Sequence, residues 1–161
     1  MKISDTMKRP RGIFHICANP ERVYSSLEEA IGAGEEIESV ENKIVNAGMQ
    51  QIGDILAGVE TTNITLTQFG VGSGSTTSAY TDTSLETEIG KVTGQITGYP
   101  YRTSNVVYNS WVVDDGFLEG TWREVGTFFG DDVMFCHINV TERAKSSGDI
   151  LQVWYEYDVT G

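Results

Sequence analysis

Four residues of types that commonly bind zinc fall in two short segments of the chain. They are His15, Cys17, Cys136 and His137. In an extended strand, residues two apart point to the same side, so His15 and Cys17 could share a site. Cys136 and His137 are adjacent and would point to opposite sides, and the chain has no Cys-x-x-Cys spacing. We therefore expect these side chains to pack in a core or an interface, and we expect no metal ligand and no cofactor site.

Other catalytic groups have little support in the sequence. The carboxylates in Asp114-Asp115-Gly116 and Gly130-Asp131-Asp132 could bind Ca²⁺ or act as a paired acid and base, but these are ordinary turn sequences. Glycines 70, 72 and 74 could approach a phosphate, yet neither a helix start nor a lysine follows them. With two histidines and no Gly-x-Ser-x-Gly elbow, a serine triad is poorly supported. We expect no catalytic residue and no enzyme.

The C-terminal half is rich in aromatic residues. A sugar-binding platform is one interpretation, and the filling of a sandwich core or a subunit interface is the favoured one. In the last predicted strand, Trp154 would face one way while Tyr155 and Tyr157 face the other. We therefore expect these three residues to be candidate assembly contacts. The aromatic set comprises Trp111, Trp122, Phe128, Phe129, Trp154, Tyr155 and Tyr157.

Composition limits the possible partners. A chain of 161 residues is about the size of one domain and can bury a full core. Its 23 acidic and 11 basic residues give a net charge of −12, which repels nucleic-acid phosphates. No apolar run reaches the roughly 18 residues that span a bilayer, and no signal peptide is recognisable. We expect neither nucleic acid nor a membrane as a partner, synthesis in a cytoplasm, and two thiols without a disulfide framework.

The charge is unevenly distributed. Residues 1–11 contain four basic side chains and only one acidic side chain, so this segment carries +3 and the remainder carries −15. Pro10 disfavours a helix at Arg9, and the segment offers few apolar side chains to bury. We expect a basic attachment arm that becomes ordered on a partner, with Lys8, Arg9 and Arg11 as candidate assembly contacts.

The sequence patterns predict a short N-terminal segment followed by a mainly β domain. They predict a strand over 13–17, a helical turn opened by Ser26 and Glu29, and a strand over 36–45. Apolar residues at three- and four-residue intervals predict an amphipathic helix over 46–57, capped by Asn46. Further strands, separated by turn residues, are predicted near 64–72, 91–97, 105–113, 120–129, 133–140 and 150–159.

This pattern indicates an antiparallel β-sandwich or barrel-like domain with one amphipathic helix. We divide the chain into residues 1–41, an N-terminal arm and attachment segment, and residues 42–161, a β-rich structural domain.

Three parts of the domain resemble a known group of proteins. Asn42–Gly48 with Ile55–Gly58 resembles the N-x-I-V-N-x-G…L-A-G opening of small tailed-phage structural proteins, of the tail, fibre or baseplate-associated type. Phe69–Gly74 with Asp82–Glu88 resembles their I-x-x-G-x-G…D-T-x-L-x-x-E segment, and Gly120–Gly126 resembles their W-x-E-x-G strand.

The resemblance implies a non-enzymatic virion structural protein of a tailed virus, present as repeated copies in the tail, neck, fibre or capsid surface. It implies synthesis in the host cytoplasm, a homo-oligomer, and as partners copies of the chain itself and other virion proteins. The alternative is a receptor- or glycan-binding module on a virion that uses the exposed loops 71–82 and 114–119.

Overall fold

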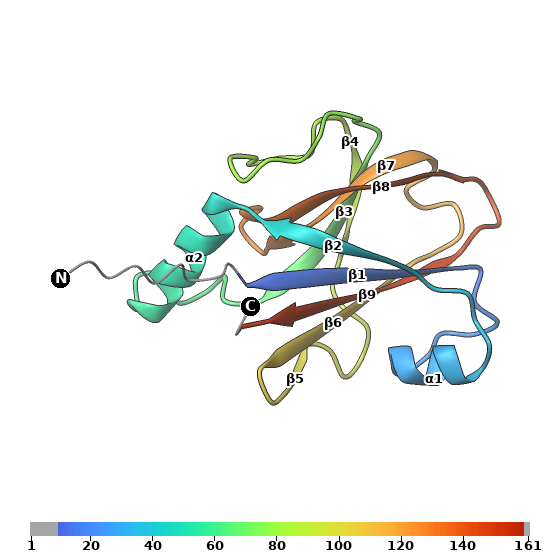
Figure 1. The fold of residues 1–161 in the computed structure, drawn as a ribbon, viewed down its shortest axis with the longest axis horizontal. Coiled ribbons are helices and arrows are strands. Elements are labelled where there is room, and N and C mark those ends of the chain that lie inside the picture. Colours follow the sequence, from blue (N-terminus) through green and yellow to red (C-terminus); the bar gives the residue numbers. More distant parts are fainter. Residues whose placement is uncertain (1–9, 160–161) are drawn as a thin grey trace.

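The structure is a computed structural model in which residues 10–159 are described (Figure 1). Its strands and helices follow the predicted order and confirm a mainly β fold of the barrel-like type. The elements are β1 Arg11–Ala18, α1 Leu27–Gly32, β2 Glu38–Ile44, α2 Asn46–Leu56, β3 Leu66–Gly72, β4 Glu88–Thr93, β5 Tyr101–Thr103, β6 Val106–Val113, β7 Gly120–Phe129, β8 Met134–Lys145 and β9 Leu151–Asp158.

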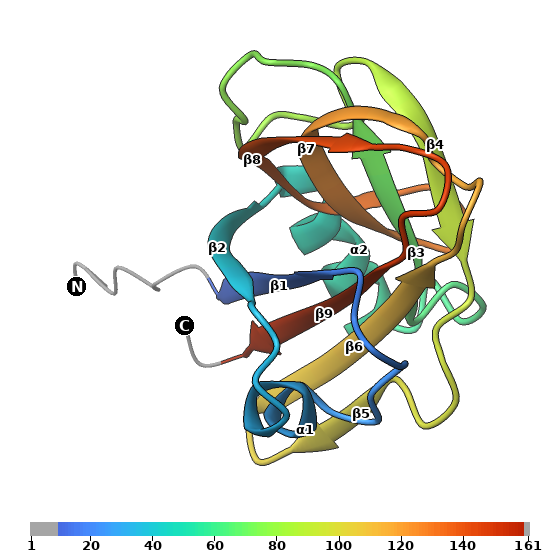
Figure 2. The same ribbon diagram turned by 90° about the vertical axis from the view of Figure 1, so that its right-hand side faces the viewer.

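The strands form one antiparallel sheet in the order β4-β3-β7-β8-β2-β1-β9-β6-β5. The sheet curls into a half-barrel, so β3 and β6 approach each other across the core (Figure 2). Two side chains join them: the Trp111 indole donates to the Thr67 carbonyl at 3.1 Å, and the Gln95 amide donates to the Leu66 carbonyl and to Asn109. These bonds connect β3 and β6 across the curled sheet.

The N-terminal strands lie in the middle of the sheet. β1 pairs with β9 along all eight of its residues and with β2 on its other side. β2 in turn pairs with β8 through Lys43 and Ile44. The boundary that we expected near residue 41 therefore falls inside one continuous sheet. Of the predicted basic arm, residues 1–11, the first nine lie outside the described residues, whereas Arg11 begins β1.

The two helices start differently. The Ser26 hydroxyl accepts the Glu29 N–H at 3.1 Å and caps α1, as the Ser26–Glu29 spacing predicted. α2 confirms the predicted helix, but the predicted cap at Asn46 is wrong: the N-cap is the buried Val45, with no side-chain capping bond. α2 packs so closely on β8 that Gly48 leaves no room for a side chain: a Cβ at this position would lie 2.6 Å from the Phe135 carbonyl oxygen.

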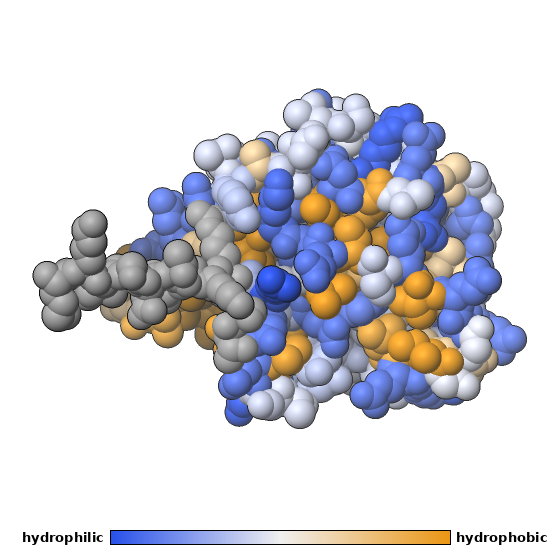
Figure 3. Space-filling view, in the orientation of Figure 1, coloured by the Kyte–Doolittle hydropathy of each residue, from blue (hydrophilic) through white to orange (hydrophobic). Residues whose placement is uncertain are grey.

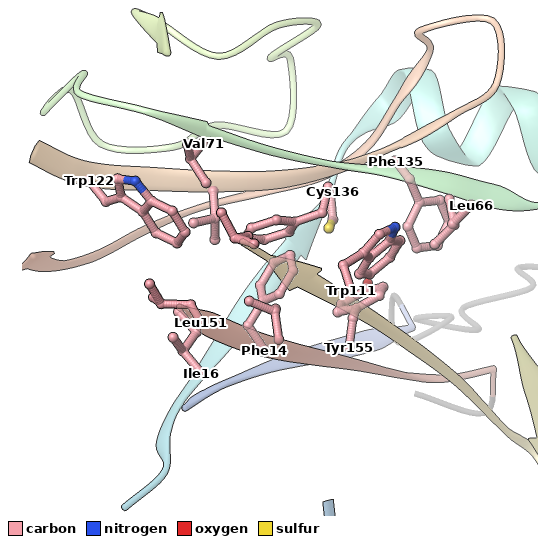
Figure 4. Close-up of a cluster of buried hydrophobic side chains, with 14 of the residues drawn as sticks. Phe14, Ile16, Leu66, Val71, Trp111, Trp122, Phe135, Cys136, Leu151 and Tyr155 are labelled. Carbon is pink, nitrogen blue, oxygen red and sulfur yellow. The ribbon is translucent and has the colours of Figure 1, made fainter. Parts of the chain in front are cut away.

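The largest of three buried clusters in the described residues is rich in aromatic side chains and fills the curl of the sheet (Figure 4). Phe69 on β3 lies at its centre, with its ring 5.9 Å from Phe14, 5.9 Å from Trp111 and 6.1 Å from Trp122. Trp111, Trp122 and Tyr155 have no exposed surface. Most of the aromatic residues of the C-terminal half therefore stabilise the fold by burial.

Candidate functional site

The most elaborate polar cluster is built around Glu124, a fully buried carboxylate on β7. One of its oxygens accepts the backbone N–H of Gly74 at 3.1 Å and of Thr87 at 2.9 Å. The other accepts the backbone N–H of Glu86 at 3.0 Å. Hydrogen bonds to a carboxylate are stronger than those between neutral groups. Glu124 therefore fastens both ends of the 73–87 loop to the sheet.

Two glycines allow the backbone of the loop to come this close to the Glu124 carboxylate. A Cβ at Gly72 would lie 2.3 Å from the Glu124 carboxylate, and one at Gly74 would lie 2.7 Å from it. Gly72 is the last residue of β3, so the alternating glycines end a strand and begin a loop that is pinned to β7. Their role in this structure is to let the backbone pass next to Glu124.

His137 on β8 extends the cluster. Its Nε2 lies 2.8 Å from Glu124 Oε2 and its Nδ1 lies 2.7 Å from Asp82 Oδ2, and its side chain is 3% exposed. Both ring nitrogens therefore lie within hydrogen-bond distance of carboxylate oxygens, one on the 73–87 loop and one on β7. In this arrangement neither nitrogen is left without a partner.

A polar pocket of about 360 Å³ opens beside His137. Threonine and serine hydroxyls, Asp82 and Glu86 line it. The Glu86 carboxylate accepts from the hydroxyl and the N–H of Thr76, and these bonds lower the pKa of Glu86. The pocket lies in the first loop that we expected for receptor binding, and its hydrogen-bonding groups are largely committed to holding the loop.

The segments that carried the family resemblance converge here. Residues 69–74, 82–88 and 120–126 all contribute to the bonds around Glu124 or border it. The first segment joins them where the Asn46 N–H donates to the Tyr80 carbonyl at 2.7 Å. These patterns therefore encode a structural junction between α2, the 73–87 loop and the sheet.

The second histidine forms a different chain of hydrogen bonds. His15 Nδ1 lies 2.7 Å from Ser39 Oγ, and its Nε2 lies 2.7 Å from Glu156 Oε2. The three side chains come from β2, β1 and β9, and His15 is the register partner of Ser39. A hydroxyl next to a histidine and an acid is the arrangement of an activated serine. However, neither Ser39 nor His15 lines either of the two pockets that include Glu156.

The four candidate zinc ligands are dispersed. Cys17 is buried beneath α1 beside Tyr24, whereas Cys136 lies in the main core, 3.0 Å from the Thr127 hydroxyl. Both thiols are free, and burial raises the pKa of each to about 11. Within residues 10–159, no group of three or more histidine, cysteine and acidic side chains could hold a metal ion. The Asp-rich turns are separate too: Asp132 pairs with Lys91 at 3.2 Å, and Asp115 accepts from Gly148.

An aromatic pocket of about 260 Å³ lies between α1 and the β5–β6 hairpin. Tyr99, Tyr101, Tyr108 and Trp154 contribute rings to it, together with carboxylates. No sequence signal identified it, because its rings come from three separate segments. Trp154 was predicted as an assembly contact, and the structure places it at the base of this pocket with 2% exposure.

Among the described residues, the remaining candidate assembly contacts lie at the other end of the molecule or inside it. Lys8 and Arg9 are outside the described residues. Arg11 is exposed at the start of β1, paired in register with Asp158. Tyr155 is fully buried and belongs to the core. Tyr157 packs edge-on against Phe135 at 4.9 Å and lines an apolar groove.

That apolar groove has a volume of about 560 Å³ and lies between α2 and the ends of β6 and β9. Around it, Leu56, Ile64 and Val159 are 83%, 51% and 51% exposed, and Val59 nearby is 74% exposed. Apolar surface at this end of the molecule is visible in Figure 3. We call this region the α2 groove. It also includes Met49, Ile52, Ile55, Leu66, Val107, Phe129 and Phe135.

Neither helix of the described residues is long and apolar enough to cross a membrane. No protein-family model, curated protein or solved structure matches this chain.

Proposed function

We propose that this chain is a non-enzymatic structural subunit of a tailed-virus particle and acts by assembling in repeated copies in the tail, neck, fibre or capsid surface. The resemblance of three sequence segments to tailed-phage structural proteins supports this role. Their convergence on the Glu124 junction supports it further, because buried hydrogen bonds between a loop and a sheet make a subunit rigid. Both histidine clusters are committed to internal hydrogen bonds, which disfavours catalysis.

The observation that carries the proposal is the α2 groove. Soluble monomers seldom expose a contiguous apolar patch of this kind, and such patches usually mark interfaces. Leu56 projects from the end of α2 with 83% of its surface in contact with solvent, although burying it would remove apolar area from water.

We propose a second copy of this chain as the partner at the groove. Pro10 lines the groove, so the sequence neighbours Lys8 and Arg9 are attached at that point. Residues 12–161 carry a net charge of −15. A basic segment anchored beside an apolar patch suits an acidic neighbour of the same kind, because complementary charge steers association and fixes its register.

Light scattering coupled to size-exclusion chromatography tests this role. We expect the parent to form an oligomer and Leu56→Asp to be a monomer with the parent's melting temperature. Ile31→Asp is the matched control, since Ile31 is also an exposed apolar helix residue, 56% exposed, but on α1. A monomeric parent, or an unchanged oligomer in Leu56→Asp, would contradict an assembly role for the groove.

The virion location needs a separate measurement. We expect antibodies against the chain to label intact particles, and we expect deletion of residues 1–9 to reduce incorporation while leaving the melting temperature nearly unchanged. The deletion stops before β1, which starts at Arg11 and pairs with two strands. Particles without label would refute the virion role, and normal incorporation of the shortened chain would refute the role of the arm.

A receptor- or glycan-binding module is the second candidate function. The aromatic pocket beside α1 favours it, because that pocket shares no lining residue with the α2 groove. Helices α1 and α2 lie at opposite ends of the molecule (Figure 1).

A further inference from the structure

We infer that the aromatic pocket between α1 and the β5–β6 hairpin binds a single neutral hexose unit of a glycan. This inference rests on the second candidate function and is independent of assembly through the α2 groove. Three features carry it: ring faces, carboxylate acceptors and a buried N–H donor that has no partner. Together they match the chemistry of a sugar ring, which has apolar C–H faces and hydroxyl groups around its edge.

The ring faces come from β5, β6 and the preceding loop. Tyr101 and Tyr108 are register partners on neighbouring strands, and their rings stack with centroids 4.9 Å apart. Tyr99 lies 5.1 Å from Tyr101 and is inclined to it by 58°. Tyr101 is 40% exposed, so its outer face is available to a ligand. The Tyr99 hydroxyl donates to the Ser25 carbonyl at 2.8 Å, which fixes the ring against the entrance to α1.

The unpartnered donor is the indole N–H of Trp154. This side chain is 2% exposed and lines the pocket, and its Nε1 has no hydrogen-bond partner among the described residues. Burial raises the pKa of Tyr99 to about 12, and a smaller interaction of the Trp154 side chain with the Tyr99 hydroxyl lowers it in part. A buried N–H without an acceptor is unfavourable. A ligand oxygen in the pocket would supply the acceptor.

Two carboxylates provide acceptors for sugar hydroxyls. Glu156 lines the pocket, and its Oε2 lies 2.7 Å from His15 Nε2, which orients the carboxylate. Glu28, in the first turn of α1, is exposed at the rim. Burial raises the pKa of Tyr108, and the charges of Glu156 and Glu28 raise it further, which places both carboxylates close to that ring.

An organic cation is the competing occupant, because aromatic faces and carboxylates also attract quaternary ammonium groups. The indole N–H decides between them. It offers a hydrogen-bond donor to a group that lies against the rings, which a sugar oxygen can accept and the trimethylammonium group of choline cannot. The volume of about 260 Å³ also suits one hexose unit and excludes a longer buried chain.

The test has two stages, both with the full chain. A glycan array first asks whether the protein binds carbohydrate at all. Saturation-transfer NMR with free hexoses and with choline then locates the site, at low salt and again in 0.5 M NaCl. We compare the parent with Tyr101→Ala, Trp154→Phe and Glu28→Gln. Phe117→Ala is the matched control, because Phe117 is an exposed aromatic residue, 47% exposed, outside the pocket.

We expect hexose binding that Tyr101→Ala and Trp154→Phe each weaken at least about tenfold, as befits a lost ring contact or a lost donor. Glu28→Gln should change it less than about threefold, because an amide oxygen still accepts a hydroxyl, and salt should have little effect. Phe117→Ala should bind as the parent does.

The results that would overturn this site differ from those that would overturn a glycan-binding function. An array signal that survives in Tyr101→Ala and Trp154→Phe would overturn this site while leaving a glycan-binding function in place. No carbohydrate signal at all would overturn both. Choline binding that is lost in Glu28→Gln and in high salt, without hexose binding, would identify a cation site and overturn the inference. Since Tyr101 is exposed at the surface, loss of binding in Tyr101→Ala with an unchanged melting temperature cannot be assigned to misfolding.

Discussion

Replacing Glu124 with glutamine should remove much of the stability of this protein without changing the shape of the side chain. Each carboxylate oxygen accepts two N–H groups: Oε1 from Gly74 and Thr87, and Oε2 from Glu86 and His137. Glutamine has one oxygen and one NH₂ group. Whichever way the amide is turned, its NH₂ group faces two donors, and two hydrogen bonds are lost.

The magnitude follows from this count. A hydrogen bond to a charged group contributes about 1.5–3 kcal/mol, and breaking a buried ion pair on one side costs about 3–5 kcal/mol. We expect the free energy of unfolding to fall by about 3–5 kcal/mol, which lowers the melting temperature by roughly 6–20 °C in a chain of this size. That is a large fraction of the usual stability of a domain.

Urea unfolding followed by tryptophan fluorescence measures the loss, and amide hydrogen exchange locates it. The N–H groups of Gly74, Glu86 and Thr87 should lose protection first, because they lose the carboxylate that holds them. Glu142→Gln is the control: its side chain is 63% exposed and pairs with Arg123 at 3.1 Å, so it should cost less than about 1 kcal/mol. If Glu124→Gln unfolds within about 1 kcal/mol of the parent with these amides still protected, the junction does not stabilise the loop.

Three further outcomes are expected from the same structure. Trp122→Ala should destabilise the fold by about 3–5 kcal/mol in urea unfolding, because the indole is fully buried and donates to the Leu118 carbonyl at 2.9 Å; a melting temperature within a degree or two of the parent would show otherwise. Gly53→Ala should stabilise the protein by about 0.5–1 kcal/mol, since its Cβ on α2 would meet nothing within 4 Å, and a loss of stability by the same measurement would refute that account. The thiols of Cys17 and Cys136 should resist a disulfide reagent at pH 8 until urea unfolds the chain. Because their pKa of about 11 exceeds the unfolded value of 9.0, the stability that they contribute is complete below pH 9 and should be lost as the pH rises towards 11; reaction of the folded protein would contradict their burial.

The type and order of the elements could be predicted from the sequence, and their pairing could not. Alternation and turn residues placed β7 at residues 120–129, as observed, and the helical spacing placed α2 within one residue of its observed end. Periodicity says nothing about which strands are neighbours, so the central position of β1 was not foreseen. β5 was missed because it consists of only three exposed residues after Pro100.

The sequence contains a signal for the Glu124 junction. Trp122, Glu124 and Gly126 alternate on one face of a predicted strand, which placed a charged residue on the same side as a core tryptophan. A carboxylate in that position needs donors, and the nearby glycine-rich segment could supply backbone N–H groups. Which loop supplies them depends on the tertiary fold. The Ser39–His15–Glu156 chain depends in the same way on pairing between three strands, two of them far apart in sequence.

Because β1 pairs with β9 along eight residues, the ribosome must deliver almost the whole chain before the sheet can close. Pairing between distant segments also makes folding slow relative to folds built from local contacts. The α2 groove also needs late segments of the chain, since its lining comes from all parts of the sequence. Examples are Pro10, Met49, Phe135 and Val159. A nascent or prematurely terminated chain therefore has no complete groove to offer a neighbour. For the proposed assembly role, this order of events would confine assembly to chains that have been made as far as β9.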